Sequence, residues 1–464
     1  MILLIGAWIF VQTPFGQNWI VKQVTIRLSR DLDTKIQIDR VDFSLFNNMH
    51  LQGVLVEDRQ QDTLLYAGEV RVRITDWFFF KKNIELKYIG LDNAKINMYR
   101  TDSVWNHQFL IDYFSSPSSG QQAKGGTRLN LREIDLTNIL FIQRDDWIGK
   151  SMTIALSAFE VDANDVNLDK KIIQLRSLKL VNPYVSLANY TGRRPDSARR
   201  PALPKEEAAA PDSLLKWNAA GWVVKADKLT IENGTFKTDR QSDTPVLSYF
   251  DGRHIDFSRI NSSFSNIKWE KDTITAQLSL QTKERSGFEV KGMKAQVKVT
   301  PQEMAFSNLE IKTNNSTIRD YFRMSYDDFS SMNNFIHAVN MQARFKNTHI
   351  DSDDIAFFAP ALHTWKKNID ITGDVRGPVS ALVGEQLLIE AGQNTLLSGD
   401  ISMTGLPDIN QTFIDFTAED FKTNYTDAVA LVPAIRQVTS PDLHKLQYIR
   451  FKGSFTGFIR DFVT

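Results

Sequence analysis

The chain has 464 residues, of which 42% are hydrophobic and 24% are charged, a composition typical of a folded protein with several domains or one long repetitive body. Its 55 Lys and Arg residues balance 55 Asp and Glu residues, and the resulting zero net charge argues against a nucleic-acid-binding protein. It contains no cysteine, which excludes disulfide frameworks, thiol catalysis and cysteine-bound metal or iron–sulfur sites.

The N-terminus is an unbroken apolar run, Met1–Val11. As a helix it would rise about 16 Å, roughly half the thickness of a bilayer's hydrocarbon core. No basic residue precedes it, so it lacks the flank of a signal peptide. We interpret residues 1–30 as an incomplete membrane anchor followed by a juxtamembrane helix over Asn18–Arg30. The alternative is a buried N-terminal helix or strand.

After this helix the hydrophobic period changes to two, which predicts strands with one apolar and one polar face. We divide these strands into a first β-repeat segment, 31–192, and a second, 214–464, which we expect to continue beyond the given sequence. Between them, residues 193–213 are rich in proline and charge and predict a disordered loop. The alternation is visible in the following stretches: Ile36–Leu45, Val70–Ile74, Ile96–Met98, Met152–Leu156, Val223–Ile231, Thr273–Leu280, Ala295–Val299, Val339–Phe345 and Phe413–Phe416.

An internal repeat supports an elongated array of strand units. In each copy, two apolar residues lie two positions apart, an asparagine follows two positions later, and a further predicted strand comes after it. The copies are Ile89–Asn93, Ile134–Asn138, Leu178–Asn182 and Leu229–Asn233. Asparagine tolerates the left-handed backbone conformation, so we expect it at tight turns between strands. Spacings of about 45 residues are typical of repeat architectures.

A second pattern relates Ile369–Gly377 to Ile449–Gly457, which share every apolar and glycine spacing. Glycines at fixed steps within strands predict bulges or close backbone approach. Helical signals are few. Short helices are expected over Asn106–Phe114 and over the spaced apolar residues Ile318–Ile336, with Asp327 or Asp328 capping the second half. A third is expected through Phe358, with Ser352 as its cap.

So little helix cannot cover the apolar face of a large sheet, and that face must fold on itself. A closed sandwich fills with its own side chains, whereas a wide U-shaped groove holds lipid chains; periodicity does not separate these outcomes. If the groove is open, the candidates to contact acyl chains are Ile36, Ile38, Val41, Phe43, Leu45, Val70, Val72, Ile74, Ile96 and Met98.

The sequence carries no common catalytic signature. It has no G-x-S-x-G, H-E-x-x-H or G-x-G-x-x-G motif, and its seven histidines lack metal-ligand spacing. We therefore predict a protein that is not an enzyme and has neither a cofactor nor a metal site.

The order of these features resembles the start of the AsmA/TamB family of envelope proteins, in its TamB-like branch. The residues that carry the resemblance are Thr13–Gly16, Leu51–Asp58, Leu64–Ala67, Val70–Ile74, Ile89–Asn93, Phe109–Asp112 and the two glycine-spaced stretches, all after the apolar N-terminus. The resemblance implies a single-pass anchor in the bacterial inner membrane and a long periplasmic body. The resemblance also implies that this body is a twisted, taco-shaped β-sheet with an apolar groove.

The resemblance implies two roles: phospholipid movement between the inner and outer membranes, and assistance to an outer-membrane assembly barrel. The family's C-terminal domain, which contacts that barrel, has no counterpart in the sequence. We therefore expect phospholipid transport as the function, with a translocation and assembly factor for outer-membrane or secreted proteins as the alternative. The expected partners are phospholipid acyl chains, the inner membrane and, through the missing region, the barrel, but no nucleic acid.

Overall fold

The computed structural model describes residues 13–44, 48–74, 85–115, 128–168, 170–195, 217–431, 435–436, 442–445, 447–458 and 461–463. Within them the protein is mostly β, and 22 strands join by hydrogen bonding into one large mixed sheet. The predicted mostly-β fold class is therefore confirmed. The described residues fall into two units. Unit 1 lies within Met1–Ser213, Gly221–Pro245 and Arg253–Asn261, and unit 2 within Leu214–Ala220, Val246–Gly252 and Ser262–Thr464.

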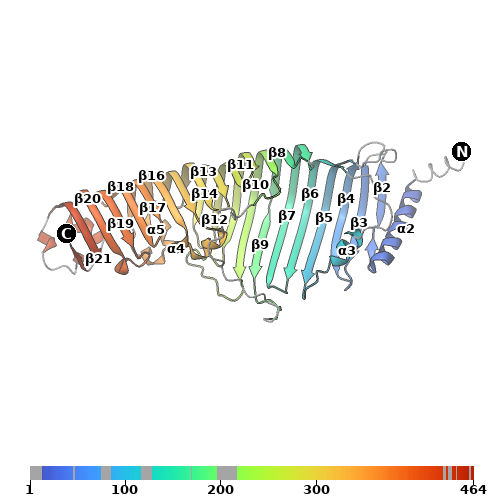
Figure 1. Cartoon of the computed structure of the whole chain (residues 1–464), viewed down its shortest axis with the longest axis horizontal. Coiled ribbons are helices and arrows are strands. Elements are labelled where there is room, and N and C mark those ends of the chain that lie inside the picture. The colour runs from blue at the N-terminus through green and yellow to red at the C-terminus, as the bar shows by residue number, and fades with distance from the viewer. Residues whose placement is uncertain are drawn as a thin grey trace. The chain divides into compact units, whose positions relative to one another are not determined.

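The first ten strands belong to unit 1. They are β1 (Ile36–Gln37), β2 (Arg40–Ser44), β3 (Asn48–Glu57), β4 (Thr63–Ile74), β5 (Glu85–Arg100), β6 (Arg128–Asp145), β7 (Lys150–Asn167), β8 (Ile172–Val181), β9 (Tyr184–Asn189) and β10 (Val223–Arg240). Strands β2 to β5 pair antiparallel in chain order, and β7 pairs antiparallel with β6, β8 and β9. Strand β6 is parallel to β5, and β10 is parallel to β8 and β9. Strands β2 to β7 thus lie side by side in sequence order (Figure 1).

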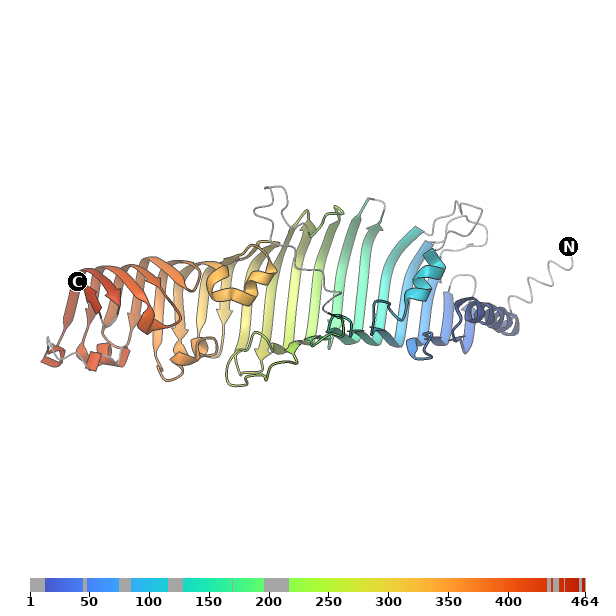
Figure 2. The same ribbon diagram turned by 60° about the horizontal axis from the view of Figure 1, so that its bottom comes forward.

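Helix α2 (Pro14–Leu32) confirms the helix predicted over Asn18–Arg30 and extends it at both ends. Thr13 caps it by accepting a hydrogen bond from the Gly16 amide at 3.1 Å, and a proline in the first turn suits the start of a helix. Helix α3 (Gln108–Ser115) confirms the second expected helix, and its Phe109 packs with Leu32 and Leu64 in one buried cluster. The short helix α3 lies against the strands at this end of unit 1 (Figure 2).

Membrane attachment remains a prediction. In the described part of the chain, no helix combines the length and apolar character needed to cross a bilayer. The predicted anchor, Met1–Val11, lies outside the described residues, as do residues 196–213 of the predicted disordered loop. The start of that loop is bonded to the sheet end, where the Arg193 amide donates to the Asp146 carbonyl at 2.8 Å.

The four repeat asparagines all adopt the left-handed conformation, as predicted. The φ angles of Asn93, Asn138, Asn182 and Asn233 lie between 48° and 52°. Their predicted place at tight turns is wrong, because Asn93, Asn138 and Asn233 lie inside β5, β6 and β10. Asn182 lies between β8 and β9, which both pair with β7 and β10. The strands bend at these residues and continue.

In unit 2, each strand from β12 pairs antiparallel with the next. The strands are β12 (Thr273–Glu284), β13 (Glu289–Thr300), β14 (Glu303–Lys312), β15 (Thr317–Ser325), β16 (Asn340–Asp351), β17 (Asn368–Gly377), β18 (Ala381–Ala391), β19 (Thr395–Thr404), β20 (Phe413–Thr423), β21 (Ile449–Phe458) and β22 (Asp461–Val463), while β11 (Asp256–Glu270) contributes residues to both units. A meander of this kind needs only short connections.

The short helices of unit 2 lie in the strand connections. They are α4 (Phe335–Ala338), α5 (Ser352–Ala356), α6 (Tyr425–Leu431) and the 3-10 helices Phe329–Asn334, Pro360–Leu362, Ile409–Gln411 and Leu443–Lys445. The helix expected from Ser352 is confirmed as α5, but its cap is Asp351, whose side chain accepts from the Asp353 amide.

The helix predicted over Ile318–Ile336 is only partly correct. Its first half is strand β15, paired on both sides with β14 and β16. Its second half is helical from Phe329 onward, with Asp328 as the cap as expected.

The glycine pattern of unit 2 marks close backbone approach, as predicted. Gly373 has a φ of 130°, and a Cβ built on it would lie 2.7 Å from the Gln386 carbonyl oxygen. Strand register shifts beside it, between Thr372 and Asp374. Gly453, its counterpart in the second copy, has a φ of 154°.

Candidate functional site: the apolar face of unit 1

One face of strands β3 to β7 carries a continuous set of aliphatic side chains, which we call the apolar face. Three of its members, Ala67, Ala94 and Ile139, are buried, and the larger side chains around them are only partly buried. These larger members are Val54, Val70, Leu91, Leu136 and Leu156. Such side chains can bind another apolar group by removing their remaining exposed area from water.

The left-handed asparagines keep this face continuous. Side chains three residues apart normally point to opposite faces of a strand. Leu91 and Ala94 nevertheless share one cluster, with the left-handed Asn93 between them, and Leu136 and Ile139 do the same around Asn138. The strand alternation therefore resets at each asparagine, and the apolar residues on both sides of the bend face the same way.

The asparagine side chains also link neighbouring strands, and we call this set the asparagine ladder. Asn138 Nδ2 donates to Asn93 Oδ1 at 3.2 Å, from β6 to β5. Asn233 Nδ2 donates to Asn182 Oδ1 at 2.8 Å, and Asn182 Nδ2 donates to the Ser157 hydroxyl at 3.1 Å. These exposed side chains join the bends of neighbouring strands.

The opposite face of β4 to β6 carries polar contacts around Arg73. Arg73 pairs with Glu133 at 3.7 Å, and its guanidinium lies 5.2 Å from the ring centre of Tyr88. Burial and a hydrogen bond to Asp135 raise the pKa of the Tyr88 phenol. Around Arg73, charged side chains thus lie on the face opposite the aliphatic cluster.

No protein-family model, curated protein or solved structure matches this chain.

The ten predicted lipid-contacting residues take different positions. Val70 belongs to the apolar face, and Val72 and Ile96, which follow at strand spacing, are partly buried. Ile36 and Met98 instead pack against the Leu32–Leu64–Phe109 cluster beneath α2 and α3. Among the remaining five, Val41 is fully buried, Ile38 is partly buried, the side chains of Phe43 and Ile74 are not described, and Leu45 lies outside the described residues.

Sequence reasoning missed several members of the apolar face, notably Ala94 beyond Asn93 and Ile139 beyond Asn138. Counting in steps of two through Asn93 or Asn138 assigns the residues beyond it to the wrong face. The signal was present in the repeat, because Ala94 and Ile139 directly follow the asparagine, where strict alternation requires a residue of the opposite face.

A small polar pocket of about 260 Å³ lies beside α3, lined in part by Arg59, Tyr99 and Arg100. Arg100 makes a two-pronged pair with Asp145 at 2.7 and 2.8 Å and lies 4.9 Å from the ring centre of Trp105. Its charge is thereby neutralised within the protein.

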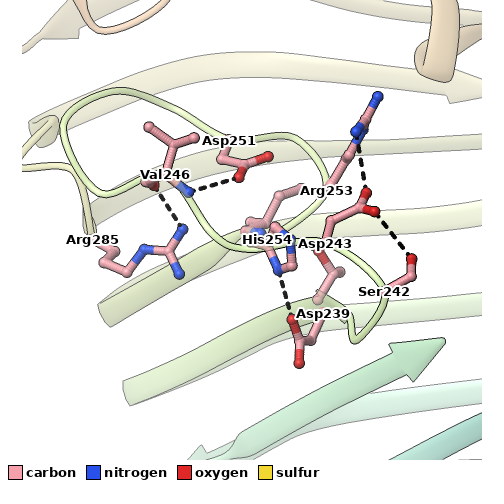
Figure 3. Close-up of polar contacts among 10 residues, drawn as sticks. Asp239, Ser242, Asp243, Val246, Asp251, Arg253, His254 and Arg285 are labelled. Carbon is pink, nitrogen blue, oxygen red and sulfur yellow. Dashed lines mark hydrogen bonds and ion pairs between the residues drawn. The ribbon is translucent and has the colours of Figure 1, made fainter. Parts of the chain in front are cut away.

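A further polar cluster follows β10 (Figure 3). His254 is 2% exposed, and its Nδ1 lies 2.6 Å from the Asp239 carboxylate near the end of that strand. Arg253 pairs with Asp243 at 3.1 Å, and the Ser242 hydroxyl donates to the same carboxylate. These contacts hold the chain after β10 against the strand end.

Proposed function

We propose that this protein is a non-enzymatic, membrane-attached protein of the bacterial envelope that carries phospholipid acyl chains along the apolar face. In this proposal the sheet of unit 1 curls into a U-shaped groove with the apolar face inside. The residues after Met1–Val11 lie in the periplasm, and the cargo moves between the inner and outer membranes.

The observation that carries the proposal is the partial exposure of the apolar face. Strand β7 illustrates it: of its 18 residues, only Ala163 is buried. A protein that closes its strands into a sandwich covers such side chains, because covering each large aliphatic side chain is worth about 1.5–3 kcal/mol. An acyl chain supplies the same cover at about 0.8 kcal/mol per buried methylene.

The division between the two faces gives further support. Cargo held on the apolar face meets aliphatic groups, whereas the charged residues around Arg73 and Glu133 lie on the other side. Acyl chains need no directional partner, so a run of aliphatic side chains over several strands lets them shift along the sheet without breaking hydrogen bonds.

The first experiment is native mass spectrometry of the full chain purified in mild detergent, with extraction and identification of bound lipids. We expect several phospholipids per chain. A stable chain without lipid contradicts the proposal and favours the assembly factor, which would then be sought by crosslinking sheet-edge positions to unfolded barrel proteins.

Two substitutions address the apolar face itself. Val72→Asp and Ile96→Asp place a carboxylate among partly buried aliphatic groups. The matched control is Lys95→Asp, since Lys95 is exposed and adjacent to Ile96 on the opposite face. We expect both apolar-face variants to fold, to lose most of the bound lipid and to transfer little lipid between donor and acceptor vesicles, while the control retains both. Folded Asp variants with unchanged lipid content contradict the assignment.

A further inference from the structure

Helix α2 has two different apolar surfaces. One packs into the protein, where Leu28 and Leu32 join the cluster with Leu64 and Phe109. The other is exposed and consists of Phe15, Trp19, Lys22, Ile26 and Arg30, which we call the outer stripe. At 3.6 residues per turn these five side chains fall within an arc of roughly 80°.

The outer stripe exposes large apolar groups that a helix facing only water does not need. Phe15 is 74% exposed, Trp19 51% and Ile26 54%. Two aromatic residues and one β-branched residue on the solvent side of a helix are typical of a surface that contacts a membrane or another protein.

The charged side chains of this helix are mostly basic. Lys22, Arg27 and Arg30 are basic, and Asp31 is the only acidic residue from Pro14 to Leu32. The Nε atoms of the exposed Arg27 and Arg30 each lie 3.6 Å from a carboxylate oxygen of Asp31. One carboxylate against three basic side chains leaves the helix with a net positive charge. Lys22 lies within the outer stripe, between Trp19 and Ile26, so that its ammonium group can reach head groups while its stem covers apolar surface.

We infer that the outer stripe docks on the surface of an anionic phospholipid bilayer, with α2 lying in the plane of the interface. Trp19 and Phe15 enter the boundary between head groups and acyl chains, and the basic side chains bind lipid phosphates. The apolar run Met1–Val11 ends two residues before the cap of α2, which places a second membrane-seeking segment directly before the stripe. This docking surface is distinct from the apolar face, and it needs a bilayer but not lipid transport.

The chain's lack of cysteine makes a matched test simple, because a single introduced cysteine takes a spin label without background. Ile26→Cys places the label on the outer stripe. Val24→Cys is the control: Val24 is 50% exposed, close to the 54% of Ile26, but points about 160° away around the helix. The accessibility of each spin label is measured in the full chain reconstituted into vesicles of phosphatidylethanolamine and phosphatidylglycerol.

We expect the Ile26 label to lose access to a water-soluble nickel chelate several-fold and to gain access to oxygen, while the Val24 label stays in water. Replacing the lipid with phosphatidylcholine, or introducing Lys22→Gln and Arg30→Gln, should reduce docking by roughly fivefold for each charge interaction lost.

Three results overturn the inference. Equal exposure of the two labels to water means that the stripe does not dock, and equal immersion means that α2 inserts as a whole. Protection of Ile26 that is independent of anionic lipid, or that rises with the protein-to-lipid ratio, indicates cover by protein, for example a second copy. A lipid-transfer assay on the same samples separates failure of docking from failure of transport.

Discussion

Asn138 holds a left-handed conformation in the middle of β6, with a φ of 52°, and its side-chain amide donates to Asn93 at 3.2 Å. Substituting it separates these two roles. Alanine in this conformation costs about 1–2 kcal/mol, and the lost exposed hydrogen bond adds about 0.5–1 kcal/mol. We therefore expect Asn138→Ala to lower the local unfolding free energy by roughly 1.5–3 kcal/mol. Asn138→Gly should cost about 1 kcal/mol less than Asn138→Ala, because glycine adopts a positive φ without strain.

Native-state hydrogen exchange of the β5 and β6 amides measures this local free energy without unfolding the rest of the chain. The control is the neighbouring Thr137, whose φ is not positive. There the order reverses, and Thr137→Gly is more destabilising than Thr137→Ala by about 0.5–1 kcal/mol. If alanine is tolerated at 138 as well as glycine is, the bend does not depend on the left-handed residue, and our account of the continuous apolar face fails.

Two other predictions concern single contacts. Burial alone raises the pKa of Asp145, but hydrogen bonds from Arg100 and from backbone amides hold the pKa of this carboxyl below its ordinary value of 3.8. The ionised Asp145 therefore contributes its full stabilisation above pH ~4, and this stabilisation is lost as the pH falls through the lowered pKa. Asp145→Asn should lower the free energy of unfolding by about 2–4 kcal/mol at neutral pH. It should also reduce the fall of that free energy at acid pH, measured by urea unfolding at a series of pH values. In unit 2, Gly373→Ala should markedly lower the urea-unfolding midpoint, because the added Cβ would lie 2.7 Å from a carbonyl oxygen. The control is Gly292→Ala, which should leave the midpoint nearly unchanged because no atom lies within 4 Å of the added Cβ. Equal midpoints for the two variants contradict the bulge interpretation.

The segment from Ile318 to Ile336 shows where sequence periodicity misleads. Ile318, Phe322 and Tyr326 are spaced by four, which fits a helix, but a spacing of four also fits one face of a strand. Neighbours decide the outcome: β14 and β16 supply hydrogen-bond partners along both edges of β15. Because these partners lie on other strands, the local sequence does not contain the deciding interaction. From Phe329 onward the Asp328 cap provides a local signal, and there the prediction holds.

The positions of the predicted lipid-contacting residues could be foreseen only in part, for a related reason. Alternation correctly places Ile36 and Met98 on apolar positions, but their position beneath helices α2 and α3 depends on packing between distant segments. Val70, Val72 and Ile96 lie farther from those helices along the strands, and Val70 joins the apolar face. The sequence thus identifies which residues are apolar and cannot identify which of them a helix covers.

Asparagine and glycine solve the same backbone problem in two different ways. Both adopt a positive φ inside a strand, and both reset the alternation of side chains. Glycine provides the positive φ and no side-chain contact. At Gly373, Gly399 and Gly453 the backbone of the next strand or a nearby ring lies where a Cβ would be. Asparagine also donates an amide across the strand boundary, as from Asn138 to Asn93 and from Asn233 to Asn182. These hydrogen bonds couple the left-handed residues of neighbouring strands. If acyl chains move over the apolar face as proposed, we therefore expect the strands beneath them to keep their register.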